Sequence, residues 1–145
     1  MTKVYVTEAE YLKGREIDHP LTDGMAANMR NLLKAINRLR GEYGRPFIVT
    51  SGYRPSALNA KIKGAKNSLH ILCAAIDIFD GDPQGAIKRW LMEHNNRRLV
   101  ESGLYMESQM YTPRHVHLQI LPPESGNRIF VPHRKPWSHI NQQAN

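Results

Sequence analysis

The sequence of 145 residues contains a single cysteine, Cys73. One cysteine excludes an internal disulfide and a zinc site built from several thiolates. The chain also lacks any run that approaches the roughly 20 consecutive apolar residues of a bilayer span, so we expect no membrane span. Its first ten residues contain no apolar segment of the signal-peptide type, and we therefore expect synthesis in the cytoplasm without a signal peptide.

Acidic residues are the minority among the charged ones. The chain has 13 aspartates and glutamates against 20 lysines and arginines, which gives a formal net charge of +7 at pH 7. Such a charge favours anionic partners: nucleic acid, an anionic membrane surface or an anionic cell-wall polymer. The basic residues are scattered along the chain without a motif of stacking aromatics, so we expect solvated surface charges and no nucleic-acid partner.

Hydrophobic residues make up 41 % of the chain, enough for a core, and the length fits one domain. Capping residues and helical periodicity predict four helices: one after Thr7, one from Thr22 to a stop at Gly41, one from Pro55 to about Lys61, and one capped by Asp82, opened by Pro83 and ending near His94. Short apolar runs predict strands at 46–50, 73–79, 104–107, 115–121 and 129–131. We interpret the chain as one α+β domain over 1–132 with its core at about 22–121, followed by a basic polar tail at 133–145. We expect a monomer.

A histidine and an aspartate, His70 and Asp77, lie seven residues apart with small and apolar residues between them. A chain that passes from a loop at His70 into a strand near Asp77 can place both side chains around one metal ion. Such a pair also occurs by chance, so its meaning depends on further ligands. The acidic run that follows Asp77 resembles a calcium loop only loosely, because its spacing differs from the EF-hand and it lacks the glutamate at the twelfth position.

Further candidate ligands lie in the last strands. His115 and His117 are separated by one residue, which in a strand points both side chains to the same face. One can bind a metal while the other reaches a bound substrate. A catalytic zinc site usually has three protein ligands and an open fourth position, and Glu107, at the end of the preceding strand, is the carboxylate best placed to act as general base. Each has a plainer alternative: a half-exposed strand face for the histidines, a solvated charge for Glu107, and a surface ion pair for Arg54.

Three segments together resemble a known family. They are Ser68-x-His70-x-x-Cys73-x-Ala75-x-Asp77, the segment Ser51-Gly52-Tyr53-Arg54-Pro55 with Asn59, and Tyr105-Met106-Glu107-Ser108 followed by His115-Val116-His117. In this order they resemble the zinc D-Ala-D-Ala carboxypeptidases and L-alanyl-D-glutamate endopeptidases, which share a fold with the hedgehog signalling domain. The resemblance covers about residues 22–121 and implies a small, mainly antiparallel sheet with helices packed on one side.

The resemblance also implies roles for individual residues. It implies one Zn²⁺ ion per chain, held by three ligands: His70, Asp77 and His117. It implies four further site residues: Glu107 as the catalytic base, His115 as a stabiliser of the transition state, and Arg54 and Ser68 as substrate-binding residues.

The implied activity is hydrolysis of peptidoglycan stem peptides, whose free carboxylates suit a basic chain. The small size resembles bacteriophage members of the family, so we expect action on the cell wall after release at host lysis or from a virion. The alternative is a catalytically inactive, zinc-stabilised binding module of the same fold. A chain that holds zinc yet leaves peptidoglycan intact would favour that alternative.

Two features depart from the family pattern. Cys73 occupies the position where the family usually has glycine, which matters if the backbone there needs a positive φ. We interpret Cys73 as a small buried side chain, with a fourth metal ligand as the alternative. The segment from Glu107 to His115 is longer than in hedgehog-like proteins, which leaves Glu101 as the alternative general base.

Overall fold

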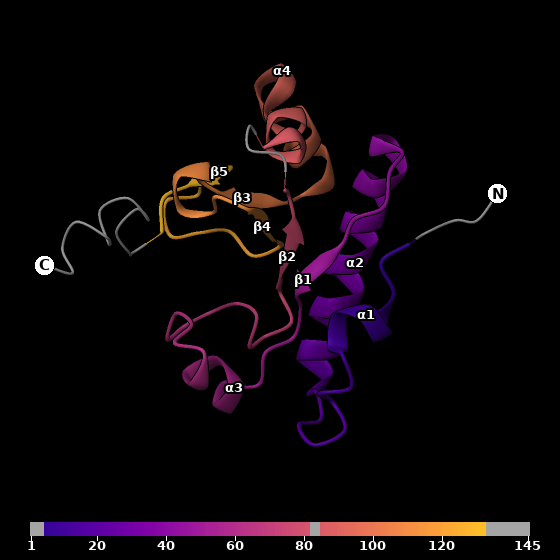
Figure 1. Ribbon diagram of the computed structural model, residues 1–145, viewed down its shortest axis with the longest axis vertical. Coiled ribbons are helices and arrows are strands. Elements are labelled where there is room, and N and C mark those ends of the chain that lie inside the picture. Colours follow the sequence, from indigo (N-terminus) through magenta and orange to yellow (C-terminus); the bar gives the residue numbers. More distant parts are fainter. Residues whose placement is uncertain (1–4, 82–84, 133–145) are drawn as a thin grey trace, which may run out of the picture.

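The computed structural model of the chain describes residues 5–81 and 85–132. A five-stranded sheet runs through its centre, with the strand order β1-β2-β4-β3-β5 (Figure 1). The strands are β1 (Val49–Ser51), β2 (Ala75–Phe79), β3 (Tyr105–Glu107), β4 (His115–Gln119) and β5 (Ile129–Phe130). Neighbouring strands pair antiparallel except β3 and β5, which are parallel. The predicted α+β fold with a mainly antiparallel sheet is confirmed, whereas the predicted tail at 133–145 lies outside the described residues.

The helices of the described residues are α1 (Glu8–Leu12), α2 (Asp23–Tyr43), α3 (Ser56–Lys61) and α4 (Ala86–Ser102), with a 3-10 turn η1 (Gln109–Tyr111). The first two begin where their capping residues predict. The hydroxyl groups of Thr7 and Thr22 accept hydrogen bonds from the amides of Glu10 and Met25, three residues further on. These bonds satisfy amides that have no partner inside the helix.

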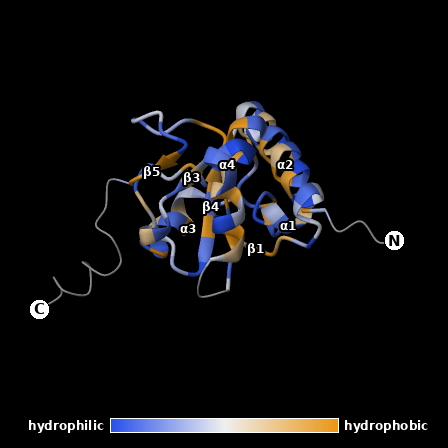
Figure 2. Cartoon of the chain, turned by 90° about the horizontal axis from the view of Figure 1, so that it is seen from above, coloured by the Kyte–Doolittle hydropathy of each residue, from blue (hydrophilic) through white to orange (hydrophobic). Residues whose placement is uncertain are grey.

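The core lies between one face of the sheet and the helices α2 and α4 (Figure 1). Figure 2 shows that α2 carries hydrophobic and hydrophilic residues side by side along its length. Its apolar positions, Leu32 and Ile36 among them, are fully buried. The predicted apolar stripe of this helix is therefore the surface that packs on the sheet.

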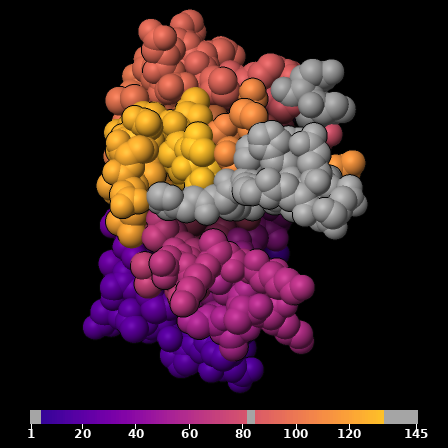
Figure 3. All heavy atoms as spheres, turned by 90° about the vertical axis from the view of Figure 1, so that its left-hand side faces the viewer, coloured from indigo at the N-terminus to yellow at the C-terminus, as the bar shows by residue number. Residues whose placement is uncertain are grey.

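Alternation along β2 and β4 separates the core from the polar face of the sheet. Ile76 and Ile78 of β2, like Val116 and Leu118 of β4, are fully buried in the core. Asp77 therefore points to the opposite face. There it lies directly across from His117 in the strand register, and His115 shares that face at period two. Figure 3 views the molecule from the side on which α3 (magenta) and the segment with β5 (yellow) lie.

Two helix ends differ from the prediction. Helix α2 continues through Gly41 to Tyr43 and ends at Gly44, whose φ of 78° is left-handed and whose amide donates to Arg40. The extra turn forms because the Tyr43 ring packs against Phe47 and Trp90, with ring centroids 5.7 and 5.0 Å away. Tertiary packing thus outweighs a glycine in the helix interior.

Helix α4 begins at Ala86, after Gly85. The predicted cap Asp82 and opening residue Pro83 lie outside the described residues. Among those described, the cap comes from further upstream, because the Asp80 carboxylate accepts hydrogen bonds from the amides of Ile87 and Lys88, both 3.2 Å long. The predicted end near His94 coincides with a break over residues 93–96, where the backbone is non-helical. A second helical segment, which was not predicted, continues to Ser102 and buries Leu99 in the core.

Candidate metal centre

Three side chains that are distant in the sequence meet on the polar face of the sheet: His70, Asp77 and His117. One ligand atom from each lies within 4.8 Å of the others. Asp77 comes from β2 and His117 from the opposing position of β4, whereas His70 comes from the loop that links α3 to β2. Folding therefore brings together the three residues predicted as metal ligands.

Both nitrogens of His70 have defined surroundings. Nδ1 lies 2.8 Å from the carbonyl oxygen of Gly52, so this nitrogen carries the proton and donates it. Nε2 then presents a lone pair and lies 3.3 Å from Asp77 Oδ1. Nε2 is buried and makes no hydrogen bond among the described residues. Buried polar atoms without a hydrogen bond are rare in folded proteins. A lone pair that is left free beside a carboxylate, on an imidazole whose other nitrogen is held by an acceptor, is the arrangement of a metal-binding histidine.

The carbonyl that orients His70 depends on a close approach between backbones. A Cβ at Gly52 would collide with the carbonyl oxygen of Tyr11 in α1. That same oxygen accepts the amide of Tyr53 at 3.0 Å. Position 52 therefore needs a glycine for steric reasons. The close approach of the two backbones keeps the Gly52 carbonyl next to His70.

His117 is oriented by a residue that sequence reasoning missed, Gln119. The Gln119 side-chain amide donates to the Leu121 carbonyl at 2.8 Å, which turns its Oε1 toward His117 Nε2, 2.9 Å away. His117 therefore donates from Nε2, and its Nδ1 faces Asp77 Oδ1 at 2.9 Å. The signal was present in the sequence, because Gln119 continues the same-face alternation of the two histidines on β4.

The electrostatics of the cluster favour a cation at its centre. Burial opposes ionisation of Asp77, but its interactions with His70 and His117, including the hydrogen bond from His117, outweigh burial and hold the pKa of Asp77 well below its usual range. Burial lowers the pKa of His70 more than Asp77 raises it. The pKa of His117 is raised, because its hydrogen bond to Asp77 outweighs burial. Without a metal, a proton on His117 Nδ1 thus neutralises the Asp77 carboxylate.

Two predicted substrate-binding residues flank the cluster. Arg54 Nη2 lies 3.5 Å from Asp77 Oδ2, while its other nitrogens donate to Ser51 Oγ at 3.0 Å and Asn59 Oδ1 at 3.2 Å. Ser68 Oγ accepts the amide of His70 at 3.2 Å. Arg54 is therefore a preorganised cation beside the ligands, and the Ser68 hydroxyl contacts the loop that carries His70.

His115 and Glu107 also lie at this face. His115 Nε2 is 4.0 Å from Asp77 Oδ2, and the side chain is 31 % exposed. Glu107 is buried at the end of β3, next to the Met106–Leu118 pair that aligns β3 with β4. Its charge raises the pKa of both His115 and His117, although burial leaves the pKa of His115 lowered overall. The alternative base Glu101 lies on α4 instead, where it pairs with Arg38 and Arg97, 3.7 Å from each.

A sequence model of one peptidase family, described as Peptidase M15, matches residues 10–119, which include every residue of this site. The chain belongs to the Peptidase M15 family. A comparison with curated proteins found no match. Membership in the M15 family indicates a peptidase, and His70, Asp77 and His117 form the place in this M15 chain that could hold a metal ion.

Cys73 is the residue at which this M15 chain departs from the expected glycine. Its φ is 58°, in the left-handed region that glycine adopts without strain. The side chain is fully buried in the core, and burial raises the pKa of its thiol to about 12. Cys73 is absent from the metal-ligating group of the described residues. It is a small buried side chain on a strained backbone and not a fourth ligand.

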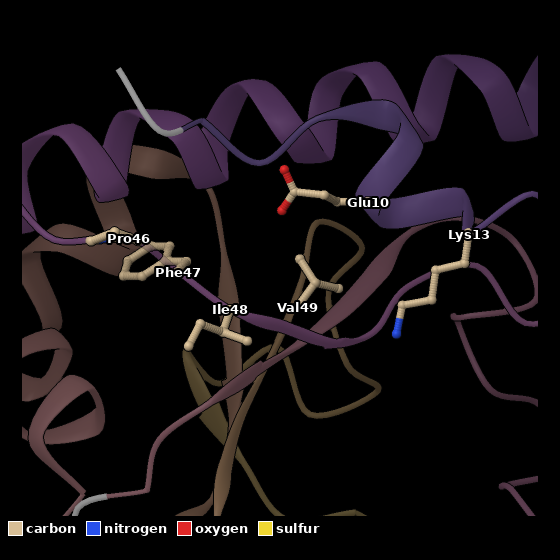
Figure 4. A pocket seen from close by; sticks show the side chains of 6 residues that line it. All are labelled: Glu10, Lys13, Pro46, Phe47, Ile48 and Val49. Carbon is tan, nitrogen blue, oxygen red and sulfur yellow. The ribbon is translucent and has the colours of Figure 1, made fainter. Parts of the chain in front are cut away.

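An open groove elsewhere on the M15 chain lies beside the segment that leads into the edge strand β1 (Figure 4). Glu10 and Lys13 line it from the α1 side, and residues 46–49 line it from the other. Lys13 Nζ reaches the Thr50 carbonyl at 3.4 Å. The groove contains none of the predicted site residues. No described helix in residues 5–81 and 85–132 has both the length and the apolar character needed to cross a membrane.

Proposed function

We propose that this M15 chain is a zinc metallopeptidase that hydrolyses the stem peptides of peptidoglycan. The observation that carries the proposal is the pair of imidazoles, His70 fully buried and His117 partly buried, each with its far nitrogen held by an acceptor and its near nitrogen turned to Asp77. Outer acceptors of this kind orient histidine ligands in metal sites.

The donor set suits zinc. Two imidazole nitrogens and one carboxylate oxygen are common zinc ligands, and three protein ligands leave one position open, as catalytic sites require. His70, Asp77 and His117 would hold one ion per chain. A zinc ion bound there would supply a Lewis acid that polarises the scissile carbonyl and favours ionisation of water.

The remaining side chains would handle the substrate and its protons. Glu107 accepts a proton from the attacking water and returns it to the leaving amine. His115 is neutral near pH 7 because burial lowers its pKa, and it donates a hydrogen bond to the developing oxyanion. Arg54 and Ser68 bind the substrate, with Arg54 holding a carboxylate or orienting a carbonyl.

Peptidoglycan is the substrate that the charge and the resemblance support. The net charge of +7 attracts the anionic wall and the free carboxylates of its stem peptides. The resemblance to small bacteriophage enzymes supports action on the wall after release at host lysis or from a virion, by a monomeric chain.

The test is mass spectrometry of muropeptides after digestion of purified peptidoglycan with the zinc-loaded chain. We expect new peptide fragments: free D-Ala if a terminal residue is removed, or a stem cut after L-Ala if the enzyme is an endopeptidase. Zinc retained without any new fragment would contradict the proposal and favour a zinc-stabilised binding module.

Glu107→Gln tests the assignment of the base. We expect this variant to keep its zinc and lose hydrolysis by about 10²–10⁴-fold, because general base catalysis contributes that much. Glu101→Gln, at the exposed carboxylate on α4, is the matched control and should retain activity. Unchanged hydrolysis by Glu107→Gln would overturn the assignment of Glu107.

A further inference from the structure

Lys88 is a buried cation outside the proposed metal centre. It lies in the first turn of α4, and only 3 % of the residue is exposed. Burial lowers the pKa of its ammonium, and the charge of Asp80 partly compensates. A buried ammonium group needs partners to offset its lost hydration, so its contacts indicate what it does.

Those contacts are backbone carbonyls at the edge of the proposed site. Lys88 Nζ donates to the Thr112 carbonyl at 2.6 Å and to the His115 carbonyl at 3.0 Å. Asp80 Oδ2 lies 3.8 Å from the same nitrogen. The ammonium group therefore joins the start of α4 and the end of β2 to the first residue of β4.

The surrounding backbone is built to fit this arrangement. Gly85 has a φ of 67°, and a Cβ there would lie 2.8 Å from Lys88 Cε. The Asp80 amide donates to the Arg114 carbonyl at 2.9 Å. The Asp80 amide thus binds the carbonyl of residue 114, and the Lys88 ammonium group binds the carbonyl of the next residue, 115.

The segment 108–114 connects two residues of the proposed mechanism, Glu107 and His115. Glu107 ends β3 and His115 begins β4, and the seven residues between them contain only the short turn η1. On one side His115 pairs with Phe79 of β2, but on the other side the β3–β4 ladder stops at the pairs Tyr105–Gln119 and Met106–Leu118, far from His115. The Lys88 contacts at residues 112 and 115 therefore hold this end of β4 on the side that β3 leaves unpaired.

We propose that Lys88, together with Asp80, is a positioning residue that sets the place of His115 relative to Asp77 and the bound substrate. The pair acts through the backbone and touches no reacting atom. The catalytic consequence rests on the proposed function, whereas the placement of His115 does not. Small misplacements of catalytic groups reduce turnover strongly.

The test compares Lys88→Met with Lys34→Met, which removes a charge from an exposed position of α2. Because Lys88→Met leaves the Asp80 carboxylate without its buried cation, Lys88→Met/Asp80→Asn is made alongside it and removes both charges. Imidazole ¹H–¹⁵N spectra of the full zinc-loaded chains, assigned with His115→Ala, report ring position without activity. We expect His115 to shift or broaden in both Lys88 variants and the rings of His70 and His117 to stay in place. Unchanged His115 signals, or equal shifts of all three rings, would overturn the proposal.

Kinetics provide the second measurement. We expect Lys88→Met to lower kcat at least about tenfold with zinc affinity unchanged, and to lower kcat by less than about twofold further in a His115→Ala background. Effects that multiply in the double variant would show that Lys88 does not act through His115. If the wild-type chain hydrolyses nothing, the proposed function fails, and the imidazole spectra alone decide whether Lys88 positions His115.

Discussion

The Asp77 carboxylate contacts four side chains that can carry positive charge. His117 and His70 approach Oδ1 at 2.9 and 3.3 Å, while Arg54 and His115 approach Oδ2 at 3.5 and 4.0 Å. Burial alone would protonate such a group, but these neighbours keep it ionised. An ionised carboxylate between two imidazoles, with its pKa lowered by its neighbours, is the centre of this site.

Cys73 provides a stability test at the residue scale. We expect Cys73→Gly to be more stable than Cys73→Ala by roughly 0.5–1 kcal/mol, because relief of a left-handed φ, worth about 1–2 kcal/mol, exceeds the entropy cost of the added glycine. Urea denaturation of both variants measures the difference. A more stable Cys73→Ala would mean that the backbone at this position is not strained.

At the scale of elements, period-two alternation accounts for most of the site. The spacing of His115 and His117 was sufficient to predict a shared face, and Thr7 and Thr22 were sufficient to predict two helix starts. The cap of α4 was not predictable, because Asp80 reaches its amides across residues that carry their own capping pattern. The anchoring by Lys88 was not predictable either, since it depends on carbonyls more than twenty residues away.

The same alternation gives a prediction for β4. We expect Gln119→Leu to weaken zinc binding by about 10–100-fold, because His117 Nε2 loses the acceptor that fixes its tautomer. Competition with a chromogenic chelator measures the affinity. Gln109→Leu, at an exposed position of η1, is the matched control. Equal affinities for the two variants would show that Gln119 does not orient the ligand.

At the scale of the whole molecule, the two faces of the sheet have different roles. One face packs against α2 and α4 and supplies the stability, while the other carries the polar cluster and is flanked by the α3 loop. Because His70 comes from that loop and the other two ligands from the sheet, a bound ion would fasten the loop to the sheet. Metal binding and folding of this side are therefore expected to be coupled.

Proton competition gives the pH dependence of metal binding. The metal-free chain holds a proton on His117 at and below a raised pKa, while the lowered pKa values of His70 and Asp77 keep both free of protons there. We expect zinc affinity to be constant above the His117 pKa and to fall about tenfold per pH unit below it. Chelator competition measures this slope. The experiment covers roughly pH 5 to 9, because histidine titrates within this range. A fall of about a hundredfold per unit would mean that a second ligand is also protonated.

The measurement that tests the account most directly is native mass spectrometry of the full chain titrated with zinc. We predict one zinc ion per wild-type chain, and no ion retained by a folded His117→Ala variant under the same conditions. Glu107→Gln should bind one ion as the wild type does, because its carboxylate is not among the ligands. A wild-type chain that binds no zinc, or a His117→Ala chain that binds it equally well, would contradict the metal centre of His70, Asp77 and His117.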